Sequence, residues 1–245
     1  MTLARPRQAV CAFENVNTEA SGRSESPSEQ AIRETLPVVD YRRLILKDGT
    51  AYLPVKGMAV DLGGIAKGYA VDRAFDLCRR EGLEDFIVDL SGNLQVSGVP
   101  HREESWKIGV RDPFDRSSTL GRIAMQSGTA VASSGSYERF VEIACRRYSY
   151  VIDPRSGYPV EGTAGVTVLA QNATTADGLS TSFFVRGLAG AKELLERCAL
   201  AEVLIVPGRY PPEIWLTPGL ARIFEPVPNL SKSVRILHSG KPLCS

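Results

Sequence analysis

The sequence is poor in residues that build metal or redox centres. It has two histidines, His101 and His238, and neither lies in a motif described below. Its five cysteines are odd in number and show no CxxC spacing, which disfavours both a zinc site and a disulfide framework. They stand at positions Cys11, Cys78, Cys145, Cys198 and Cys244. Neither a zinc centre nor a cross-linked scaffold is therefore expected.

The sequence also lacks a long apolar run and an excess of charge of one sign. No apolar run is long enough to span a bilayer, so we expect no transmembrane segment. There are 29 lysines and arginines against 28 aspartates and glutamates, so nucleic acid is not an expected partner. Met1–Phe13 has basic residues without a following apolar region, and on this sequence we expect a cytoplasmic chain without an export signal.

The chain does contain enough apolar sequence, 43% of 245 residues, for a large folded domain. Residues 14–30 are the exception, because they are rich in serine and glutamate and hold too little apolar surface to fold alone. We expect residues 1–30 to form a flexible leader. Residues 226–245 contain proline and show no pattern of secondary structure, so we expect them to form a tail.

Between these ends, short strand patterns occur in clusters that helical patterns interrupt only occasionally. We expect helices at 28–36, 65–80, 175–186 and 189–198. The expected strands are 42–46, 51–54, 86–90, 94–97, 106–111, 122–126, 130–133, 148–152, 165–169 and 202–206, with a hairpin over 213–224. This order favours an α+β fold with a largely antiparallel or mixed sheet over a regular βαβ array.

The most informative stretch is DLGGIAKGYAVD at 61–72, which combines two glycines with a lysine at the start of a helical pattern. Gly63 and Gly64 let the backbone pass close to a ligand, and the helix that follows would direct free N–H groups at an anion. Lys67 adds a full positive charge. The pattern therefore indicates a phosphate site. The alternative is an ordinary turn that joins a strand to a helix, with Lys67 in solvent.

A second signal is TTADGLST at 174–181. On a helix, Asp177 and Thr181 lie one turn apart on the same face, where a carboxylate and a hydroxyl can share a hard cation such as Mg²⁺. The alternative is a capping box from Thr174 to Asp177, with the Thr181 hydroxyl bonded back to the preceding turn. The octapeptide taken alone favours the cap.

Two further segments carry weaker signals. Residues 148–157 read as a strand that ends in a tight turn with proline and glycine. Residues 133–139 place small hydroxyl side chains before a possible helix start, which is equally typical of a plain N-cap.

Taken in order, these four segments resemble the ApbE-type FAD:protein FMN transferases. The matching stretches are DLGGIAKGYAVD at 61–72, SSGSYERF at 133–140, RYSYVIDPRSGYPV at 147–160 and TTADGLST at 174–181. The resemblance implies an ApbE-like α+β domain over residues 31–225. It further implies an enzyme that binds FAD with Mg²⁺ and moves the FMN part onto a Ser or Thr hydroxyl of a target flavoprotein, with release of AMP.

The resemblance also assigns roles by position. Three residues are expected to contact the flavin nucleotide: Asp61, Lys67 and Ile152. Three are expected to bind Mg²⁺: Gly64 through its carbonyl, Asp177 and Thr181. The chemistry agrees with this set, because attack on a pyrophosphate gathers negative charge that a divalent cation and a lysine stabilise.

The chain departs from the family pattern at two places. Tyr150 stands where the family usually carries a histidine that is a candidate for proton transfer, so Tyr150 is the expected catalytic position here. The family also usually begins with an N-terminal lobe, often behind an export signal, and residues 1–27 show no resemblance to it. If that N-terminus is missing, the resemblance implies a periplasmic or membrane-associated protein instead of a cytoplasmic one.

Three functions stay open on the sequence. The first is the Mg²⁺-dependent flavin transferase. The second is a hydrolase that splits FAD into FMN and AMP, with water in place of the protein hydroxyl. The third is a flavin- or protein-binding remnant without turnover.

Overall fold

The computed structural model describes residues 3–4, 27–136, 140–143, 146–197 and 201–238. These residues belong to two units that each have their own internal contacts. Unit 1 is Met1–Gly64 with Arg139–Glu161, and unit 2 is Ile65–Glu138 with Gly162–Ser245. The chain therefore passes from one unit to the other directly after the Gly-Gly pair of the first motif.

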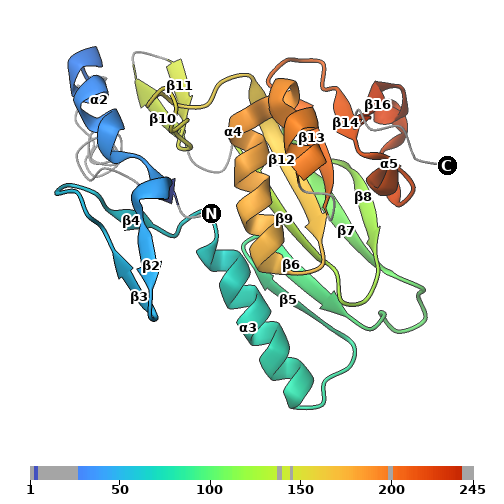
Figure 1. Cartoon of the computed structure of the whole chain (residues 1–245). Coiled ribbons are helices and arrows are strands. Elements are labelled where there is room, and N and C mark those ends of the chain that lie inside the picture. The colour runs from blue at the N-terminus through green and yellow to red at the C-terminus, as the bar shows by residue number, and fades with distance from the viewer. Residues whose placement is uncertain (1–2, 5–26, 137–139, 144–145, 198–200, 239–245) are drawn as a thin grey trace. The chain divides into compact units, whose positions relative to one another are not determined.

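Unit 1 is built from short elements, labelled in Figure 1. Its helical elements are α2 (Glu29–Thr35), η2 (Leu36–Val38) and η3 (Tyr41–Arg43). Its strands are β1 (Leu3–Ala4), β2 (Ile45–Lys47), β3 (Thr50–Tyr52), β4 (Val60–Asp61), β10 (Phe140–Ile143) and β11 (Arg146–Ser149). Within the described residues these strands form three antiparallel pairs, β1 with β4, β2 with β3 and β10 with β11.

The helix α2 packs on the turn that follows β11. The Ser28 hydroxyl accepts the Ala31 N–H and caps the helix, and Ile32 is its buried residue. Gly157 lies against Ile32 with a φ of +77°. A side chain there would meet Ile32 Cγ2 at 2.5 Å, so glycine lets the turn and the helix approach each other.

Unit 2 contains the larger sheet and the two long helices. Its helical elements are α3 (Ala66–Arg80), α4 (Ala173–Arg197), α5 (Pro218–Ala221) and η4 (Pro228–Ser233). Its strands are β5 (Phe86–Leu90), β6 (Asn93–Ser97), β7 (Trp106–Arg111), β8 (Thr119–Met125), β9 (Ala130–Gly135), β12 (Thr163–Ala170), β13 (Glu202–Pro207), β14 (Ile214–Leu216), β15 (Phe224–Pro226) and β16 (Val234–Ile236).

The strands of unit 2 form two sheets. The described residues give a seven-stranded sheet of order β16-β14-β13-β12-β9-β6-β5 and a three-stranded sheet of order β15-β8-β7. All pairs are antiparallel except β14 with β16. The predicted α+β class with a largely antiparallel or mixed sheet is therefore confirmed.

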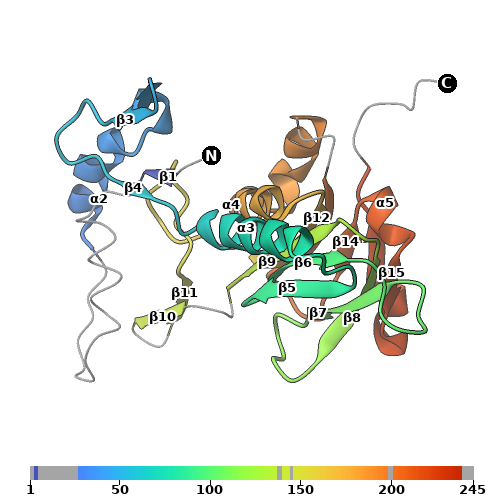
Figure 2. The ribbon, with the colours of Figure 1, turned by 90° about the horizontal axis from the view of Figure 1, so that it is seen from below.

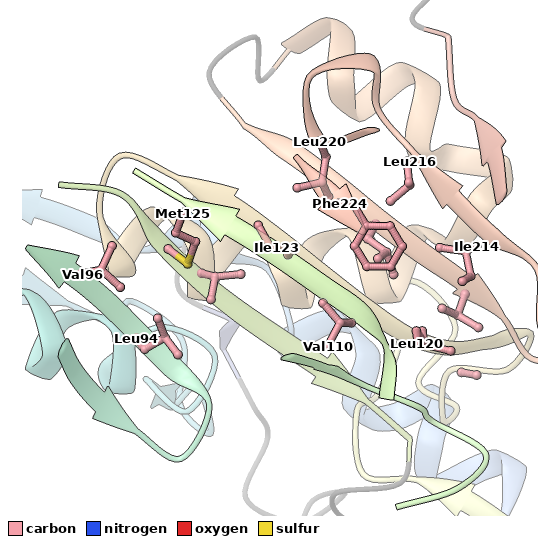
Figure 3. Packing of buried hydrophobic residues seen from close by; sticks show 14 residues of the cluster. Leu94, Val96, Val110, Leu120, Ile123, Met125, Ile214, Leu216, Leu220 and Phe224 are labelled. Atoms are coloured by element: carbon pink, nitrogen blue, oxygen red, sulfur yellow. The ribbon is translucent and has the colours of Figure 1, made fainter. Parts of the chain in front are cut away.

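The large sheet has a different neighbour on each face. Figure 2 shows α3 and α4 over one face, and β7 and β8 over the other. The main apolar core lies between the two sheets, where Leu94 and Val96 of β6 meet Ile123 and Met125 of β8 (Figure 3). Alternate residues of a strand point to opposite faces. Asn93, Gln95 and Ser97 of β6 therefore face the helices.

Several predicted elements differ from the structure. The expected hairpin over 213–224 is wrong, since β14 pairs with β13 and β16 whereas β15 pairs with β8 of the other sheet. Residues 226–236 are not a tail without structure, because β16 adds a strand to the large sheet. The strand predicted at 130–133 continues to Gly135, and the possible helix start after these residues falls on 137–139, which lie outside the described residues. Of the expected leader, residues 1–2 and 5–26 lie outside the described residues.

Two predictions about helices need comment. The break expected between 186 and 189 is confirmed, because Gly187 leaves the helical region with a φ of 59° and a ψ of −170°. The helical spacing over residues 65–80 predicts an apolar face made of Ile65, Tyr69, Ala70, Ala74, Leu77 and Cys78. This interpretation missed the buried face, which is made by Gly68 and Val71, while Tyr69 and Leu77 are 59% and 51% exposed.

Candidate functional site at the junction of α3 and α4

Asp177 is a buried carboxylate near the start of α4. Its side chain is only 3% exposed, and Oδ2 accepts the backbone N–H of Gly68 in the first turn of α3 at 2.9 Å. Within the described part of the chain, Oδ1 makes no hydrogen bond. Buried carboxylates are normally paired with a cation or bind a metal ion, so this arrangement favours a positive partner at Oδ1.

The two helices approach closely because Gly68 has no side chain. A Cβ at this position would overlap the Ala173 carbonyl oxygen and lie 2.8 Å from Asp177 Cβ. Asp72, one turn further along α3, accepts the N–H groups of Ala173 and Thr174 at 2.7 and 2.9 Å, and it also accepts the Thr174 hydroxyl. A carboxylate of α3 therefore caps the first turn of α4.

This geometry corrects the capping interpretation of residues 174–181. The N-cap of α4 is Asn172, whose Oδ1 accepts the Thr175 N–H at 2.8 Å. Thr174 lies inside the helix and turns its hydroxyl to Asp72. Asp177 caps nothing in its own helix, since its carboxylate accepts from α3. A capping box of Thr174 and Asp177 is therefore wrong.

Three hydroxyl groups lie beside Asp177. Ser180 Oγ and Thr181 Oγ1 lie 2.9 and 3.4 Å from the Asp177 carbonyl oxygen, so the expected back-bond of Thr181 is present but long. Ser134 of β9 lies 2.8 Å from Ser180 Oγ and 3.4 Å from Thr181 Oγ1. The junction thus presents one carboxylate and several hydroxyls, a set of oxygen donors of the kind that hard cations prefer.

The first turn of α3 has no side-chain cap from its own N-cap residue, Ile65. Lys67 is partly buried in this turn and forms no ion pair within the described residues. The positive end of a helix and a lysine together attract negative charge.

Four predicted site residues lie in unit 1. Asp61 belongs to β4, and its Oδ1 accepts the Gly63 N–H at 2.6 Å, so it shapes the turn that leads to Gly64. Ile152 forms a single antiparallel bridge with Pro159 rather than lying in a continuous strand. Tyr150 lies just after β11 and is partly exposed.

The turn after Ile152 is held by its own residues. Asp153 accepts the N–H of Arg155 at 2.9 Å and pairs with the Arg155 guanidinium at 2.6 Å. The Asp153 carbonyl also accepts the Gly157 N–H at 2.8 Å, which closes the turn. Unit 2 therefore brings Asp177, Thr181 and the turn that carries Lys67 together, while Asp61, Gly64, Tyr150 and Ile152 belong to unit 1.

The comparisons with known proteins fit this motif order. The model of the ApbE family matches residues 9–205, which is most of the chain. The chain belongs to the ApbE family. The predicted resemblance is therefore confirmed, whereas the expectation that residues 1–27 show no resemblance is wrong for residues 9–27, which the family model includes.

The match to curated ApbE relatives covers only part of each relative's length. The chain is 33% identical over 160 residues to the FAD:protein FMN transferase of Salmonella typhimurium, covering 65% of the chain and 46% of the relative. It is 31% identical over 200 residues to the enzyme of the same name from Treponema pallidum, covering 75% and 55%. The chain thus spans about half the length of the curated relatives it matches.

Solved ApbE structures share the fold. The ApbE protein of Thermotoga maritima aligns with a TM-score of 0.79 and 30% identity over 91% of this chain and 72% of that one. The flavinyl transferase ApbE of Pseudomonas stutzeri aligns with a TM-score of 0.74 and 25% identity over 91% and 69%.

The sequence analysis did not identify the residues that hold α3 and α4 together at their junction. Gly68 and Asp72 were part of the first motif, but only the spatial contact with α4 gives them a role. Their partners lie more than 100 residues away, so no local pattern could reveal them. The strand predicted at 130–133 ended one residue before Ser134, and no local pattern places that strand beside the motif Asp177–Thr181.

The described residues contain no group of three or more His, Cys, Asp or Glu side chains placed to hold a metal ion. None of their helices is both long and apolar enough to cross a membrane. Any metal at the junction of α3 and α4 would therefore depend on one carboxylate together with hydroxyl, carbonyl and substrate oxygens.

Proposed function

We propose that this chain carries the phosphate-transfer centre of a Mg²⁺-dependent FAD:protein FMN transferase. It would move FMN from FAD onto a Ser or Thr hydroxyl of a target flavoprotein and release AMP. One observation carries the proposal: among the described residues, one oxygen of the buried Asp177 carboxylate makes no hydrogen bond, and this carboxylate lies one turn before Thr181 and against the first turn of α3. Membership of the ApbE family and the names of the relatives support the same activity.

The residues of the junction fit Mg²⁺. Asp177 and Thr181 would hold the ion, and the Gly64 carbonyl is the third proposed ligand. Mg²⁺ is commonly bound by one or two carboxylates together with waters and substrate phosphates, so a single buried carboxylate is sufficient. When bound, the ion would neutralise negative charge on the pyrophosphate of FAD.

The nucleotide would lie at the start of α3. Lys67 would pair with a phosphate oxygen, and the N–H groups of the same turn would add hydrogen bonds. Asp61 and Ile152 are the proposed further contacts to the flavin nucleotide. Because Gly68 already donates to Asp177, the turn would link the phosphate contacts to the carboxylate that binds the ion.

The reaction is a substitution at phosphorus. The acceptor hydroxyl oxygen forms a bond to the phosphorus of the FMN part, the bond from that phosphorus to the oxygen of AMP breaks, and AMP leaves with the bond electrons. The hydroxyl proton must be taken up, and Tyr150 is the proposed residue for this proton transfer. A tyrosine hydroxyl is a weaker base at neutral pH than the imidazole of histidine, which predicts slow turnover.

A product assay tests the proposed function. The purified chain is incubated with FAD, Mg²⁺ and a Ser/Thr acceptor peptide, and both AMP and fluorescent FMN-peptide are measured. The transferase produces AMP and labelled peptide in equal amounts. AMP without labelled peptide would show a hydrolase, and bound FAD without either product would show a binding protein, so each of these results contradicts the proposal.

A substitution at Tyr150 tests the proposed proton transfer. We expect Tyr150→His to raise the rate of peptide labelling by about ten-fold or more, within the usual contribution of general base catalysis. Tyr148→His is the matched control, since it changes a neighbouring tyrosine of the same segment. An equal change in both variants would contradict the role assigned to position 150, and a loss in Tyr150→His would contradict the slow turnover expected with tyrosine.

A further inference from the structure

Asn93 is a polar residue of unit 2 whose buried side chain has no hydrogen-bond partner among the described residues. Asn93, the first residue of β6, is 0% exposed, and neither Nδ2 nor Oδ1 has a hydrogen bond within the described residues. Buried side-chain amides in folded proteins are nearly always hydrogen-bonded, directly or through ordered water. An unpartnered amide lowers stability, so its presence calls for a role.

The strand register shows which face Asn93 occupies. Leu94 and Val96 of β6 belong to the core between the two sheets. Asn93 and Ser97 are offset from them by one residue, so they face the helices. The contact between the Arg79 guanidinium of α3 and Ser97 Oγ, at 3.2 Å, confirms that this face lies under α3.

The same contacts show which end of α3 covers Asn93. Phe75 and Arg79, in the second half of α3, meet Phe86 and Ser97, which are paired across β5 and β6. Val71 clusters with Val88 at the middle of these strands.

Asn93 and Leu90 form the opposite end of the β5–β6 pair. A helix rises 1.5 Å and a strand about 3.3 Å per residue, so four strand residues match about nine helix residues. Counting back from Arg79 places Asn93 beneath the first two turns of α3, where Gly68 meets Asp177.

We propose that Asn93 is a positioning residue for the Mg²⁺ centre at the junction of α3 and α4. Its amide holds an ordered water that bonds to the oxygen ligands of the ion, and so fixes their orientation. Hydrogen-bonded groups behind the ligands of a metal tune its affinity in this way. The inference rests on the proposed function, because it requires the Mg²⁺ site at Asp177.

The test replaces the amide by an apolar side chain of similar volume. In Asn93→Leu, the dissociation constant of Mg²⁺, measured by calorimetry with FAD present, should rise by roughly ten-fold or more. The thermal midpoint without Mg²⁺ should stay equal or rise, because the variant removes an unpartnered polar group. Asn93→Ser keeps a hydrogen-bonding group and room for water, and should retain most of the affinity.

Ser97→Ala is the matched control on the same face of β6, at the other end of α3. It should leave Mg²⁺ affinity unchanged. Unchanged Mg²⁺ affinity in Asn93→Leu would overturn the inference while the proposed function stands. A parallel loss of stability and affinity in both Asn93 variants would overturn it too, by showing a purely structural role. If the wild-type chain binds no Mg²⁺ with FAD, both proposals fail.

Discussion

The junction of α3 and α4 in unit 2 and the turn after Ile152 in unit 1 are held in opposite ways. At the junction, Gly68 meets Asp177 across 109 residues and Asp72 meets Ala173 across 101 residues. In the turn, Asp153 bonds to Arg155 two residues away. The junction depends on contacts between two helices, whereas the turn depends on hydrogen bonds between its own residues together with the packing of α2 on Gly157.

This difference decides what a substitution does in each place. A change at the junction separates two helices and disturbs the core of unit 2, whereas a change in the turn is felt locally. Both tryptophans of the chain, Trp106 and Trp215, lie in unit 2, so tryptophan fluorescence reports the unfolding of that unit.

Gly68→Ala should be the most damaging change. The added methyl group overlaps the Ala173 carbonyl in a packed contact, and we expect a loss of about 3 kcal/mol in the unfolding free energy of unit 2. Urea unfolding followed by tryptophan fluorescence measures it. The matched control is Gly178→Ala in α4, where the nearest atom is 3.8 Å away and helix propensity predicts a gain of up to about 1 kcal/mol. Equal effects of the two variants would contradict the close approach of the helices.

Gly157→Ala should destabilise the turn of unit 1 by about 2 kcal/mol, because an alanine at a φ of +77° is strained and its methyl meets Ile32. The expected result is faster tryptic cleavage after Arg155, roughly 30-fold if local opening limits the rate. Gly49→Ala has a similar φ of +73° with open space around it, so cleavage after Arg155 should not change. A fall in the stability of unit 2 in Gly157→Ala would argue against a local effect.

Asp72→Ala removes the carboxylate that caps α4. The loss of two backbone hydrogen bonds at the first turn should lower the unfolding free energy of unit 2 by about 1–2 kcal/mol. The same urea experiment measures it. Asp76→Ala, on the exposed side of α3, serves as the control and should stay within about 0.5 kcal/mol of wild type. Equal stability of Asp72→Ala and Asp76→Ala would contradict the capping of α4 by Asp72.

Ser91→Gly should give a small gain. Ser91 has a φ of 54° in the two-residue turn between β5 and β6, where glycine is unstrained, so we expect about 0.5–1 kcal/mol of added stability. Asp48 has a φ of 50° at the same position of the β2–β3 hairpin, but aspartate tolerates this region better. Asp48→Gly should therefore gain less, as measured by the midpoint of heat unfolding. A larger gain in stability in Asp48→Gly than in Ser91→Gly would contradict the greater strain assigned to Ser91.

Local patterns predicted much of the fold. The helix at 65–80, the strand at 86–90 and the break near Gly187 followed from periodicity and glycine, and the structure has all three. The hairpin predicted over 213–224 failed because two apolar strands with a short connection look alike whether they pair with each other or join different sheets. Strand partners are set by the whole core, which no window of sequence contains.

The sequence indicated the residue types of the candidate site, but it did not indicate the contacts that hold those residues in place. A carboxylate and a hydroxyl one helical turn apart are visible in the sequence, and so are the glycines before α3. The local reading preferred a capping box because Thr174 and Asp177 have the right spacing. Asn172 and Asp72 fill that role instead, and only the packing of α3 on α4 shows it.

The Mg²⁺ dependence of AMP release from FAD directly tests whether Asp177 binds a Mg²⁺ ion that the reaction needs. The wild-type chain, Asp177→Asn and the exposed-site control Asp76→Asn are compared over a Mg²⁺ titration. We expect AMP release to require Mg²⁺ in the wild type and in Asp76→Asn. In Asp177→Asn, we expect the rate of AMP release to fall by at least about 100-fold, as is typical when a metal or charge contact is removed from a phosphoryl-transfer site. AMP release that is independent of Mg²⁺, or equal in wild type and Asp177→Asn, would contradict it.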